Sequence, residues 1–295
     1  MKIQDFYLNK LNPIISFEIF PPKTEKGLNN LKATIRELIA LSPDYITVTY
    51  GAMGSTRDKT IEIASFIRDE YDFETACHLT CVGATRDELN RTISTIYNLG
   101  INNIVALRGD PPSGKKEFAP HENGFKYGYQ LVELIRNFEY EEKINQHFGI
   151  AVAGYPEKHI EALSFDTDIA NLKRKISAGA NLVITQLFYE NQHYYKFVEK
   201  VRDSGLDVPI VPGLMPILST KQIKKSASMC GSQIPTELSV ELEKAGENDE
   251  LAIEIGIEQC IAQCKELLKS GVPGIHFYVL NKSQHMQKII KSLPV

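Results

Sequence analysis

Eight short apolar runs, separated by amphipathic stretches, constrain the fold of this chain more than any other feature of its sequence. Each run is rich in Ile, Val, Thr and Phe, and most are continuously apolar, which is typical of strands covered on both faces. The runs comprise residues 14–20, 45–50, 76–81, 103–107, 149–155, 182–188, 209–214 and 274–280. The sequence therefore predicts eight buried parallel strands.

The stretches between the runs have the periodicity of amphipathic helices. Residues 28–41 place Leu31, Ile35 and Leu38 on one stripe. The same reading applies to residues 59–70, 87–99 and 171–180, the last of which contains Gly179, a residue typical of a helix end. This alternation predicts an α/β fold, and eight units predict closure into a single (β/α)8 TIM barrel. An open, doubly wound sheet is the structural alternative.

Two segments are longer than a minimal connection between a strand and a helix. Residues 108–126 form a loop containing Pro, Gly and Lys after the fourth run. Residues 219–270 separate the seventh and eighth runs, and Gly231 and Pro235 interrupt them. We expect an extra segment of two or three helices there, so that residues 1–295 form one barrel domain.

Charge and hydropathy exclude several other classes of protein. The formal net charge of the 295 residues is −4, so no basic surface predicts binding to nucleic acid or to an anionic membrane. No apolar run approaches the length of a membrane span, and residues 1–6 lack the apolar stretch of a signal peptide. We therefore expect a cytoplasmic protein without nucleic-acid or membrane partners.

Five cysteines without a C-x-x-C motif predict free thiols rather than a disulfide framework. Cys77, His78 and Cys81 lie in one predicted strand, where a metal site can be imagined. Alternation along a strand, however, directs His78 to the opposite face from both sulfur atoms. We therefore expect no metal site.

Glu18 stands out within the first run, an otherwise apolar segment that stops at Pro21 and Pro22. A carboxylate there is costly to bury without a partner or a proton. On its own the residue is also compatible with an outward-facing Glu on a half-exposed edge strand. In a barrel, by contrast, the carboxyl ends of the strands build the active site. Polar residues end or follow most other runs too: Thr49, Tyr50, His78, Arg108, Asp110, Tyr155, His159, Gln186, Tyr278 and Asn281.

Longer motifs surround these positions, in order, from residue 16 to residue 282. They read SFEIFPPK at 16–23, VTYGA at 48–52, HLTC at 78–81, ALRGD at 106–110, AGYPE at 153–157, NLKRK at 171–175, AGA at 178–180, ITQ at 184–186, PG at 212–213 and HFY at 276–278. Together they resemble the motifs of the methylenetetrahydrofolate reductase family, and the length resembles its short bacterial form.

The resemblance implies an FAD-dependent (β/α)8 barrel enzyme that works by a ping-pong hydride relay. NADH or NADPH would reduce the flavin and leave, and 5,10-methylenetetrahydrofolate would then take the hydride to give 5-methyltetrahydrofolate for methionine synthesis. The resemblance also implies a homo-oligomer. Two alternatives stay open: the same reduction with a different electron donor or a partner protein, and a flavin- or folate-binding barrel without turnover.

The chemistry that the resemblance implies needs a proton as well as a hydride. Protonation of N10 opens the five-membered ring of the folate to a 5-iminium cation, so a general acid must hold its proton near neutral pH. Glu18 matches the acid of the family, and its apolar run suits a raised pKa. Asp110 matches a carboxylate beside the flavin that would stabilise the cation. An Asp that simply starts a turn is the alternative for Asp110.

Further site residues transfer position by position from the resemblance. Thr49, Tyr50, Ala52, His78, Arg108, Gly109, Asp110, Tyr127, Gly128, Tyr155, His159 and Ala162 would bind the flavin. Asp168, Asn171, Arg174 and Lys175 would bind ribose and pyrophosphate from one helix face, for which a solvated basic face is the alternative. Asp110, Gln186, Gln222 and Lys282 would bind the folate.

Two positions depart from the pattern of the family. Ser226 stands one helical turn after Gln222, where well-known bacterial members carry a Phe that stacks on nicotinamide or folate. Lys282 stands where an Arg is frequent, which keeps the charge but loses the bidentate geometry. We expect both departures to affect affinity for substrate and nucleotide more than the reaction itself.

Overall fold

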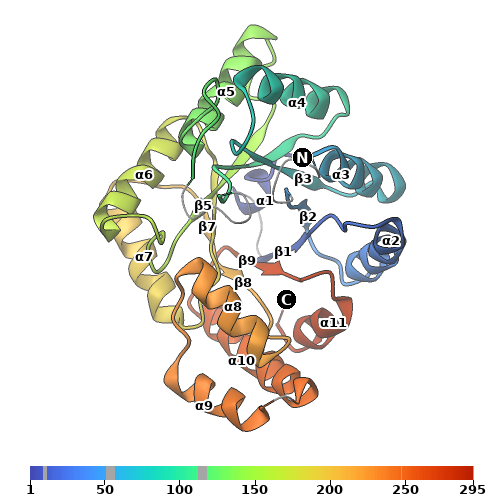
Figure 1. Cartoon of the computed structure of the whole chain (residues 1–295), viewed down its shortest axis with the longest axis vertical. Helices are drawn as coiled ribbons and strands as arrows, with labels where there is room; N and C mark the ends of the chain where they lie inside the picture. Colours follow the sequence, from blue (N-terminus) through green and yellow to red (C-terminus); the bar gives the residue numbers. More distant parts are fainter. Residues whose placement is uncertain (9–11, 51–56, 112–117, 247, 295) are drawn as a thin grey trace.

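The chain forms a closed barrel of parallel strands surrounded by helices (Figure 1). The computed structural model describes residues 1–8, 12–50, 57–111, 118–246 and 248–294. The strands are β1 (Ile14–Ile19), β2 (Tyr45–Val48), β3 (Thr75–Thr80), β4 (Asn103–Leu107), β5 (Gly149–Gly154), β6 (Leu182–Thr185), β7 (Ile210–Val211), β8 (Gly213–Leu214) and β9 (Gly274–Tyr278). All eight pairings between neighbouring strands are parallel.

Pro212 divides the predicted seventh strand into β7 and β8, and this division is how the barrel closes. The strand order is β7-β6-β5-β4-β3-β2-β1-β9-β8, so β7 pairs with β6 while β8 pairs with β9. The Pro212 carbonyl accepts a hydrogen bond of 2.9 Å from the backbone N–H of His276, and Gly213 N–H donates to Thr185 Oγ1 at 2.9 Å. The predicted barrel is confirmed, and the open-sheet alternative is excluded by this closure.

Helices alternate with the strands and, apart from α1, surround the barrel (Figure 1). They are α1 (Asp5–Leu8), α2 (Glu25–Ile39), α3 (Arg57–Tyr71), α4 (Arg86–Asn98), α5 (Gly128–Glu141), α6 (Phe165–Ser177), α7 (Asn191–Asp203), α8 (Thr220–Cys230), α9 (Thr236–Ala245), α10 (Asp249–Lys269) and α11 (Ser283–Lys291). The extra segment between the last two strands of the predicted barrel is helical, as expected, and comprises α8, α9 and α10. Gly231, in the left-handed conformation with φ +74°, ends α8.

Helix α6 begins six residues earlier than its sequence pattern predicts. Ser164 caps it by accepting a hydrogen bond from Thr167 N–H, so the helix starts at Phe165 rather than at Asn171. Its carboxyl end falls at Ser177, and Gly179 follows with φ +115°. The earlier start adds Asp168 to the same helix as Asn171.

Two apolar layers hold the barrel. The outer layer packs strand residues such as Phe17 and Phe277 against the helices, and both side chains are fully buried. An inner layer fills the amino-terminal end of the barrel with one side chain from most strands, Ile14 and Tyr45 among them. Phe6 and Tyr7 of α1 pack against this inner layer, so the start of the chain covers that end.

Alternation along β1 sends Ile15, Phe17 and Ile19 to the outer layer and leaves Ser16 and Glu18 on the inner face. Ser16 is fully buried, so the interior above the apolar floor is lined by polar side chains.

Among the described residues, no helix is long and apolar enough to cross a membrane.

The closure should be sensitive to bulk at Gly213. A Cβ atom at this position would lie 2.1 Å from the Thr185 carbonyl oxygen, so the backbone has to move to admit it. We expect Gly213→Ala to lower the free energy of unfolding by about 2–3 kcal/mol, measured by urea denaturation.

Gly271→Ala serves as the control for that substitution. Gly271 has φ +82° but open space around its Cα, so Ala there should cost about 1 kcal/mol through backbone strain alone. Equal losses in the two variants would contradict the close approach at Gly213.

Candidate active site

Glu18 projects into the barrel interior near the carboxyl end of β1, between two histidines. Its Oε2 lies 3.2 Å from His276 Nε2 and 3.2 Å from His78 Nε2, and it accepts a hydrogen bond of 3.4 Å from Thr47 Oγ1. The side chain is 15% exposed. Because β1 lies between β2 and β9 in a closed barrel, the alternative of an outward-facing Glu on an edge strand is wrong.

The two imidazoles determine the charge of this carboxyl group. Burial raises the pKa of Glu18, but the charges and hydrogen bonds of His78 and His276 outweigh it and lower the pKa to about 2. The prediction of a raised pKa, made from the apolar run alone, is wrong for this structure. Its error has a simple cause: the histidines come from β3 and β9, far from Glu18 in sequence.

His276 links Glu18 to a second set of polar groups deeper in the barrel. The side chain is fully buried, and its Nδ1 lies 2.8 Å from Ser16 Oγ. Ser16 in turn hydrogen bonds with the hydroxyl groups of Tyr7 and Tyr45, which lie 2.6 Å from each other. Sequence reasoning did not assign His276 or Ser16 a role, although period-two alternation already places Ser16 on the same face as Glu18.

Asp110 lies in the turn after β4, at the rim of the barrel. The preceding Gly109 has φ +87°, and a Cβ atom there would lie 2.7 Å from Val82 Cγ1, so this turn requires glycine. Asp110 is exposed, and its negative charge contributes to raising the pKa of Tyr155 and of Cys230, after the larger effect of burial on each. The aspartate therefore faces the side of the rim formed by the loop after β5 and by α8.

Arg108 is engaged by a residue that sequence reasoning missed. Its Nη1 and Nη2 donate to the two carboxylate oxygens of Glu161 at 2.5 and 2.8 Å, and its guanidinium lies 4.7 Å from the centre of the Phe118 ring. The hydrogen bond with Glu161 is the main cause of the raised pKa of Arg108. This bidentate pair joins the loop after β4 to the loop after β5.

Asp168 and Lys175, two of the four residues assigned to ribose and pyrophosphate, lie on α6 beside two residues assigned to the flavin, Tyr155 and His159. Asp168 Oδ2 accepts a hydrogen bond of 3.0 Å from His159 N–H, and Lys175 Nζ donates to the Ala153 carbonyl at 2.6 Å. Tyr155 packs edge-on against His159, with ring centres 4.7 Å apart, and lies 5.6 Å from Lys175 Nζ. These five residues form one cluster, which we call the α6 cluster.

Burial dominates the electrostatics of the α6 cluster. It lowers the pKa of Lys175 to about 8, although the charge of Asp168 opposes that shift. Burial likewise raises the pKa of Asp168. Next to the cluster, Arg174 and Asn171 lie nearer the solvent, with Arg174 Nη1 3.4 Å from Asn171 Oδ1.

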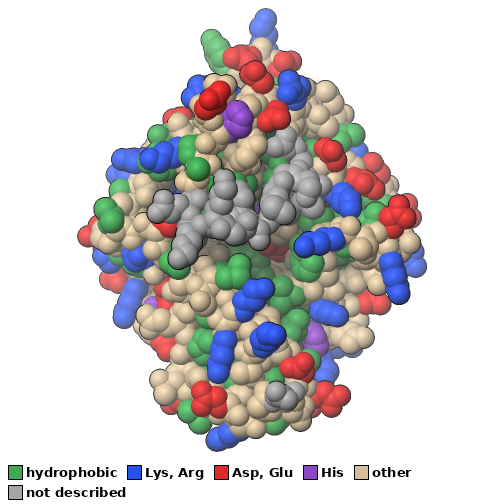
Figure 2. All heavy atoms as spheres, viewed as in Figure 1, with side chains coloured by type: hydrophobic (Ala, Val, Ile, Leu, Met, Phe, Trp, Pro, Cys, Tyr) green, Lys and Arg blue, Asp and Glu red, His purple; other side chains and the backbone are tan. Residues whose placement is uncertain are grey.

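Gln186 and Gln222 occupy different elements of the same rim. Gln186 directly follows β6, and its Oε1 accepts from Leu187 N–H at 2.9 Å. Gln222 lies on α8, where its Oε1 accepts from Leu218 N–H at 3.0 Å and its Nε2 lies 3.4 Å from Ser226 Oγ. Figure 2 shows Lys and Arg side chains gathered over α8, which contributes the exposed Lys221, Lys224 and Lys225.

The remaining predicted residues fall at strand ends and in nearby turns. Thr49 N–H donates to the Ile19 carbonyl at 2.8 Å, Tyr127 stacks on Tyr129, and Gly128 begins α5. The Ala162 carbonyl accepts from Lys158 Nζ at 2.6 Å, Tyr50 packs against the outer layer, and Lys282 is exposed at the start of α11. Ala52 lies outside the described residues.

Tyr278 closes the interior beside the two-part seventh strand. Its hydroxyl group donates to the Thr185 carbonyl at 2.6 Å, across from β9 to β6.

Cys77 and Cys81 lie in the outer layer while His78 faces Glu18, as the alternation predicts. Within the described ranges, no three His, Cys, Asp or Glu side chains are arranged to hold a metal ion.

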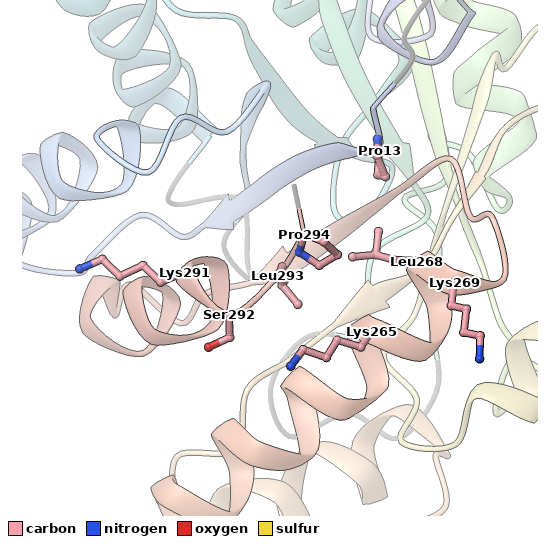
Figure 3. Close-up of a pocket in the computed structure, with 8 residues that line it drawn as sticks. All are labelled: Pro13, Lys265, Leu268, Lys269, Lys291, Ser292, Leu293 and Pro294. Carbon is pink, nitrogen blue, oxygen red and sulfur yellow. The ribbon is translucent and has the colours of Figure 1, made fainter.

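A surface groove of about 530 Å³ lies elsewhere, at the start of β1 and beside the carboxyl ends of α10 and α11 (Figure 3). Pro13, Lys265, Leu268, Lys269, Lys291, Ser292, Leu293 and Pro294 line it. Pro13 directly precedes β1, and the other lining residues lie on or just after the last turns of α10 and α11, whereas Glu18 and Asp110 lie at or after the carboxyl ends of their strands. The groove is therefore separate from the candidate active site.

Comparison with known proteins now identifies the family. The family model described as methylenetetrahydrofolate reductase matches residues 2–294. The chain belongs to the methylenetetrahydrofolate reductase family. It is 40% identical over 287 residues to "Methylenetetrahydrofolate reductase (NADH) 1" of Arabidopsis thaliana, an alignment that covers 94% of this chain and 48% of the plant protein. The chain thus spans about half the length of the plant relatives that it matches.

Bacterial relatives match over more of their own length. The "5,10-methylenetetrahydrofolate reductase" of Escherichia coli K12 is 38% identical over 283 residues, with 95% of this chain and 90% of that protein covered. Among solved structures, an uncharacterised Clostridium thermocellum protein that binds two copies of 5-methyl-5,6,7,8-tetrahydrofolic acid superposes with a TM-score of 0.67. It is 18% identical and covers 98% of this chain and 97% of its own, so this likeness shows the shared fold.

The lowered pKa of Glu18 predicts a dependence of stability on pH. A group whose folded pKa is depressed contributes stability above its unfolded pKa and loses it as the pH falls through the folded value. The ordinary value is 4.5 and the folded value is about 2, so this contribution should disappear as the pH falls from about 5 to about 2. We expect Glu18→Gln to lose stability at pH 7 and to flatten the acid limb of the unfolding curve, measured by urea denaturation between pH 7 and 3.

Glu199→Gln is the matched control, because Glu199 is an exposed glutamate on α7. It should leave both the stability and its pH dependence unchanged. An acid limb in Glu18→Gln that is as steep as in the wild type would contradict the ion pairs that we assign to Glu18.

Proposed function

We propose that this protein reduces 5,10-methylenetetrahydrofolate to 5-methyltetrahydrofolate, with a bound FAD that NADH or NADPH reduces first. The observation that carries the proposal is the position of Glu18: a carboxylate held between two imidazoles at the active end of a barrel. Such a cluster can hold and deliver a proton above the apolar floor of the barrel. The names of the plant and bacterial relatives, and the folate bound by the Clostridium thermocellum protein, support the same substrate.

The α6 cluster fits the phosphate end of FAD. Lys175 is a half-buried cation whose Nζ donates to the Ala153 carbonyl, and a phosphate oxygen would give it a full counter-charge. We propose that Asp168, Asn171, Arg174 and Lys175 bind ribose and pyrophosphate. We further propose that the flavin ring lies against Thr49, Tyr50, Ala52, His78, Arg108, Gly109, Tyr127, Gly128, Tyr155, His159 and Ala162. When bound, FAD supplies two-electron transfer between the nicotinamide and the folate.

The residues of the chain supply the proton, orient the folate and provide the electrostatic stabilisation for this reaction. Glu18 passes a proton to N10 of the folate, which opens the five-membered ring. Asp110 places a negative charge at the rim that stabilises the iminium cation of the opened folate. Gln186 and Gln222 offer carboxamides to the donor and acceptor edge of the pterin, and Lys282 offers a charge to the glutamate tail.

In this proposal the nucleotide would bind and leave before the folate binds at the same site, so the relay would be ping-pong. Ser226 motivates the second candidate, a different electron donor for the same folate, because it places a small hydroxyl beside Gln222 rather than a ring that stacks on nicotinamide.

One anaerobic experiment separates these proposals. The purified protein should be yellow, should bleach when NADH or NADPH is added, and should recover its colour with 5,10-methylenetetrahydrofolate. Colour without bleaching by either nucleotide would favour the different donor. Bleaching without recovery by the folate would overturn the proposed reaction.

Removal of the Glu18 carboxyl group should separate the two half-reactions. We expect Glu18→Gln to keep FAD and to bleach with NAD(P)H at a rate within about twofold of the wild type. Folate-driven recovery of the colour should fall by about 100-fold or more, because the general acid is lost. Stopped-flow absorbance of the flavin measures both rates. A folate half-reaction near the wild-type rate would show that the proton comes from another group.

Removal of the Lys175 charge should weaken the hold on FAD. Loss of a charge-assisted hydrogen bond costs about 1.5–3 kcal/mol, so Lys175→Met should raise the dissociation constant of FAD by at least about tenfold, measured by fluorescence titration. Lys173→Met is the control, because Lys173 lies on the same helix but is exposed and donates to Ser204 instead. Equal affinity in the two variants would remove Lys175 from the phosphate site.

A further inference from the structure

The geometry around Glu18 poses a question that the proposed function leaves open, namely where the proton resides before the folate arrives. Its two histidine contacts favour the ionised carboxylate, whose pKa they lower to about 2 despite burial. An ionised carboxylate has no proton to give at neutral pH. Two imidazoles, each with Nε2 3.2 Å from Glu18 Oε2, are in position to hold the proton instead.

We propose that His276 holds this proton as an imidazolium ion at rest and hands it to the folate through Glu18. The proposal rests on the proposed function and deepens it. His276 acts through Glu18 rather than on the substrate, so it is a positioning residue that also stores the proton. It is neither one of the predicted site residues nor a residue that contacts the folate or the flavin in the proposal above.

Contacts at both ring nitrogens support His276 in this role. Nε2 lies 3.2 Å from Glu18 Oε2, and Nδ1 lies 2.8 Å from Ser16 Oγ. An imidazolium ion needs an acceptor at each nitrogen, and a carboxylate on one side with a hydroxyl oxygen on the other provides both. A fully buried imidazolium without such partners would be too costly to form.

The tyrosine pair at the floor of the barrel keeps Ser16 available as an acceptor. Burial raises the pKa of Tyr45 to about 12 and also raises the pKa of Tyr7, so both hydroxyl groups stay protonated and neutral. Ser16 can then donate its own proton to a phenol oxygen while it accepts the Nδ1 proton of His276. When His276 is charged, each group in the series Glu18, His276, Ser16 and the two tyrosines thus has a hydrogen-bond partner.

Several titratable groups surround His276, and Glu18 is its principal counter-charge among them. They are Glu18 of β1, His78 of β3, Tyr45 of β2, Tyr7 of α1 and Tyr278 of β9 itself. On its other side β8 contributes Gly213, which carries no charge. His78 competes for the same carboxylate oxygen, and the structure gives His276 the additional acceptor, Ser16.

The proton transfer balances without any further reactant. The Nε2–H bond of His276 breaks as the O–H bond of Glu18 forms, and this bond breaks in turn as N10 of the folate gains the proton. The bond between N10 and the methylene carbon then breaks, with its electron pair remaining on N10. His276 is left neutral, with its proton on Nδ1, and regains the Nε2 proton from solvent after the product leaves.

The test compares two substitutions of His276. His276→Gln keeps an N–H donor near the Nε2 position but cannot ionise, whereas His276→Phe removes both the donor and the charge. We expect both to bleach with NAD(P)H at rates within about twofold of the wild type and to lose about 100-fold in folate-driven reoxidation. Reoxidation by His276→Gln near the wild-type rate would show that His276 serves as a hydrogen-bond donor alone, and would overturn the proposal.

A pH profile distinguishes proton storage from packing. The wild-type rate of folate-driven reoxidation should fall as the pH rises and the imidazolium deprotonates. In His276→Gln this fall should move to lower pH by more than one unit. His285→Asn is the control, because His285 lies on α11 outside the barrel, and it should keep the wild-type profile. An unshifted profile in His276→Gln would contradict the proposal.

Nuclear magnetic resonance provides a readout that does not depend on turnover. The chain has seven histidines, so ¹⁵N-histidine labelling gives few ring signals, and the signals missing from His276→Gln identify His276. Both ring nitrogens of His276 should be protonated at pH 7, and Glu18→Gln should move the titration of this ring to lower pH by at least one unit. A neutral ring at pH 7 in the wild type would overturn the proposal even if the protein reduces the folate. If the folate fails as a substrate while the ring is charged, the proposed function fails and the stored proton stands.

Discussion

The barrel closes at Pro212 and Gly213, and the arrangement of its interior follows from that closure. It brings β9 beside β8 on one side and β1 on the other, and so it places His276 in register with Ser16 and within reach of Glu18. The closure requires a glycine because the Thr185 carbonyl approaches the backbone at that point. The polar interior exists because the strands on both sides of β1 are present and the floor below is sealed by apolar side chains.

The interior then determines the chemistry that the site can perform. A carboxylate alone in this apolar barrel would take up a proton, whereas a carboxylate between two imidazoles stays charged. Binding and release of the proton are consequently determined by Glu18, His78 and His276 together rather than by one side chain. At the rim, the α6 cluster and the pair of Arg108 and Glu161 are built from loops that follow other strands, as is usual for this architecture.

The sequence alone predicted the barrel well because strand and helix periodicities are local. Each run between residues 14 and 280 contains at least part of one strand, and the extra helices fall where the long connection predicted them. The early start of α6 was missed because one serine cap, Ser164, determines it. Membership of the family is confirmed, while the roles of individual site residues stay predictions.

Long-range contacts explain what the sequence could not reveal. The pKa of Glu18 depends on His276, which is 258 residues away, and no local pattern states which histidine meets which carboxylate. Glu161 escaped notice for the same reason, because its partner Arg108 lies on a different loop. The position of Ser16 could have been predicted from the sequence, because alternation places it on the inner face below Glu18.

The Glu18 carboxyl group is ionised at rest and is held by the imidazoles around it. An infrared difference spectrum of the wild type against Glu18→Gln, taken at pH 7 without substrate, measures this ionisation. We expect carboxylate stretching bands that are lost in the variant. A protonated-carboxyl C=O band in the wild type that disappears in Glu18→Gln would contradict this ionisation.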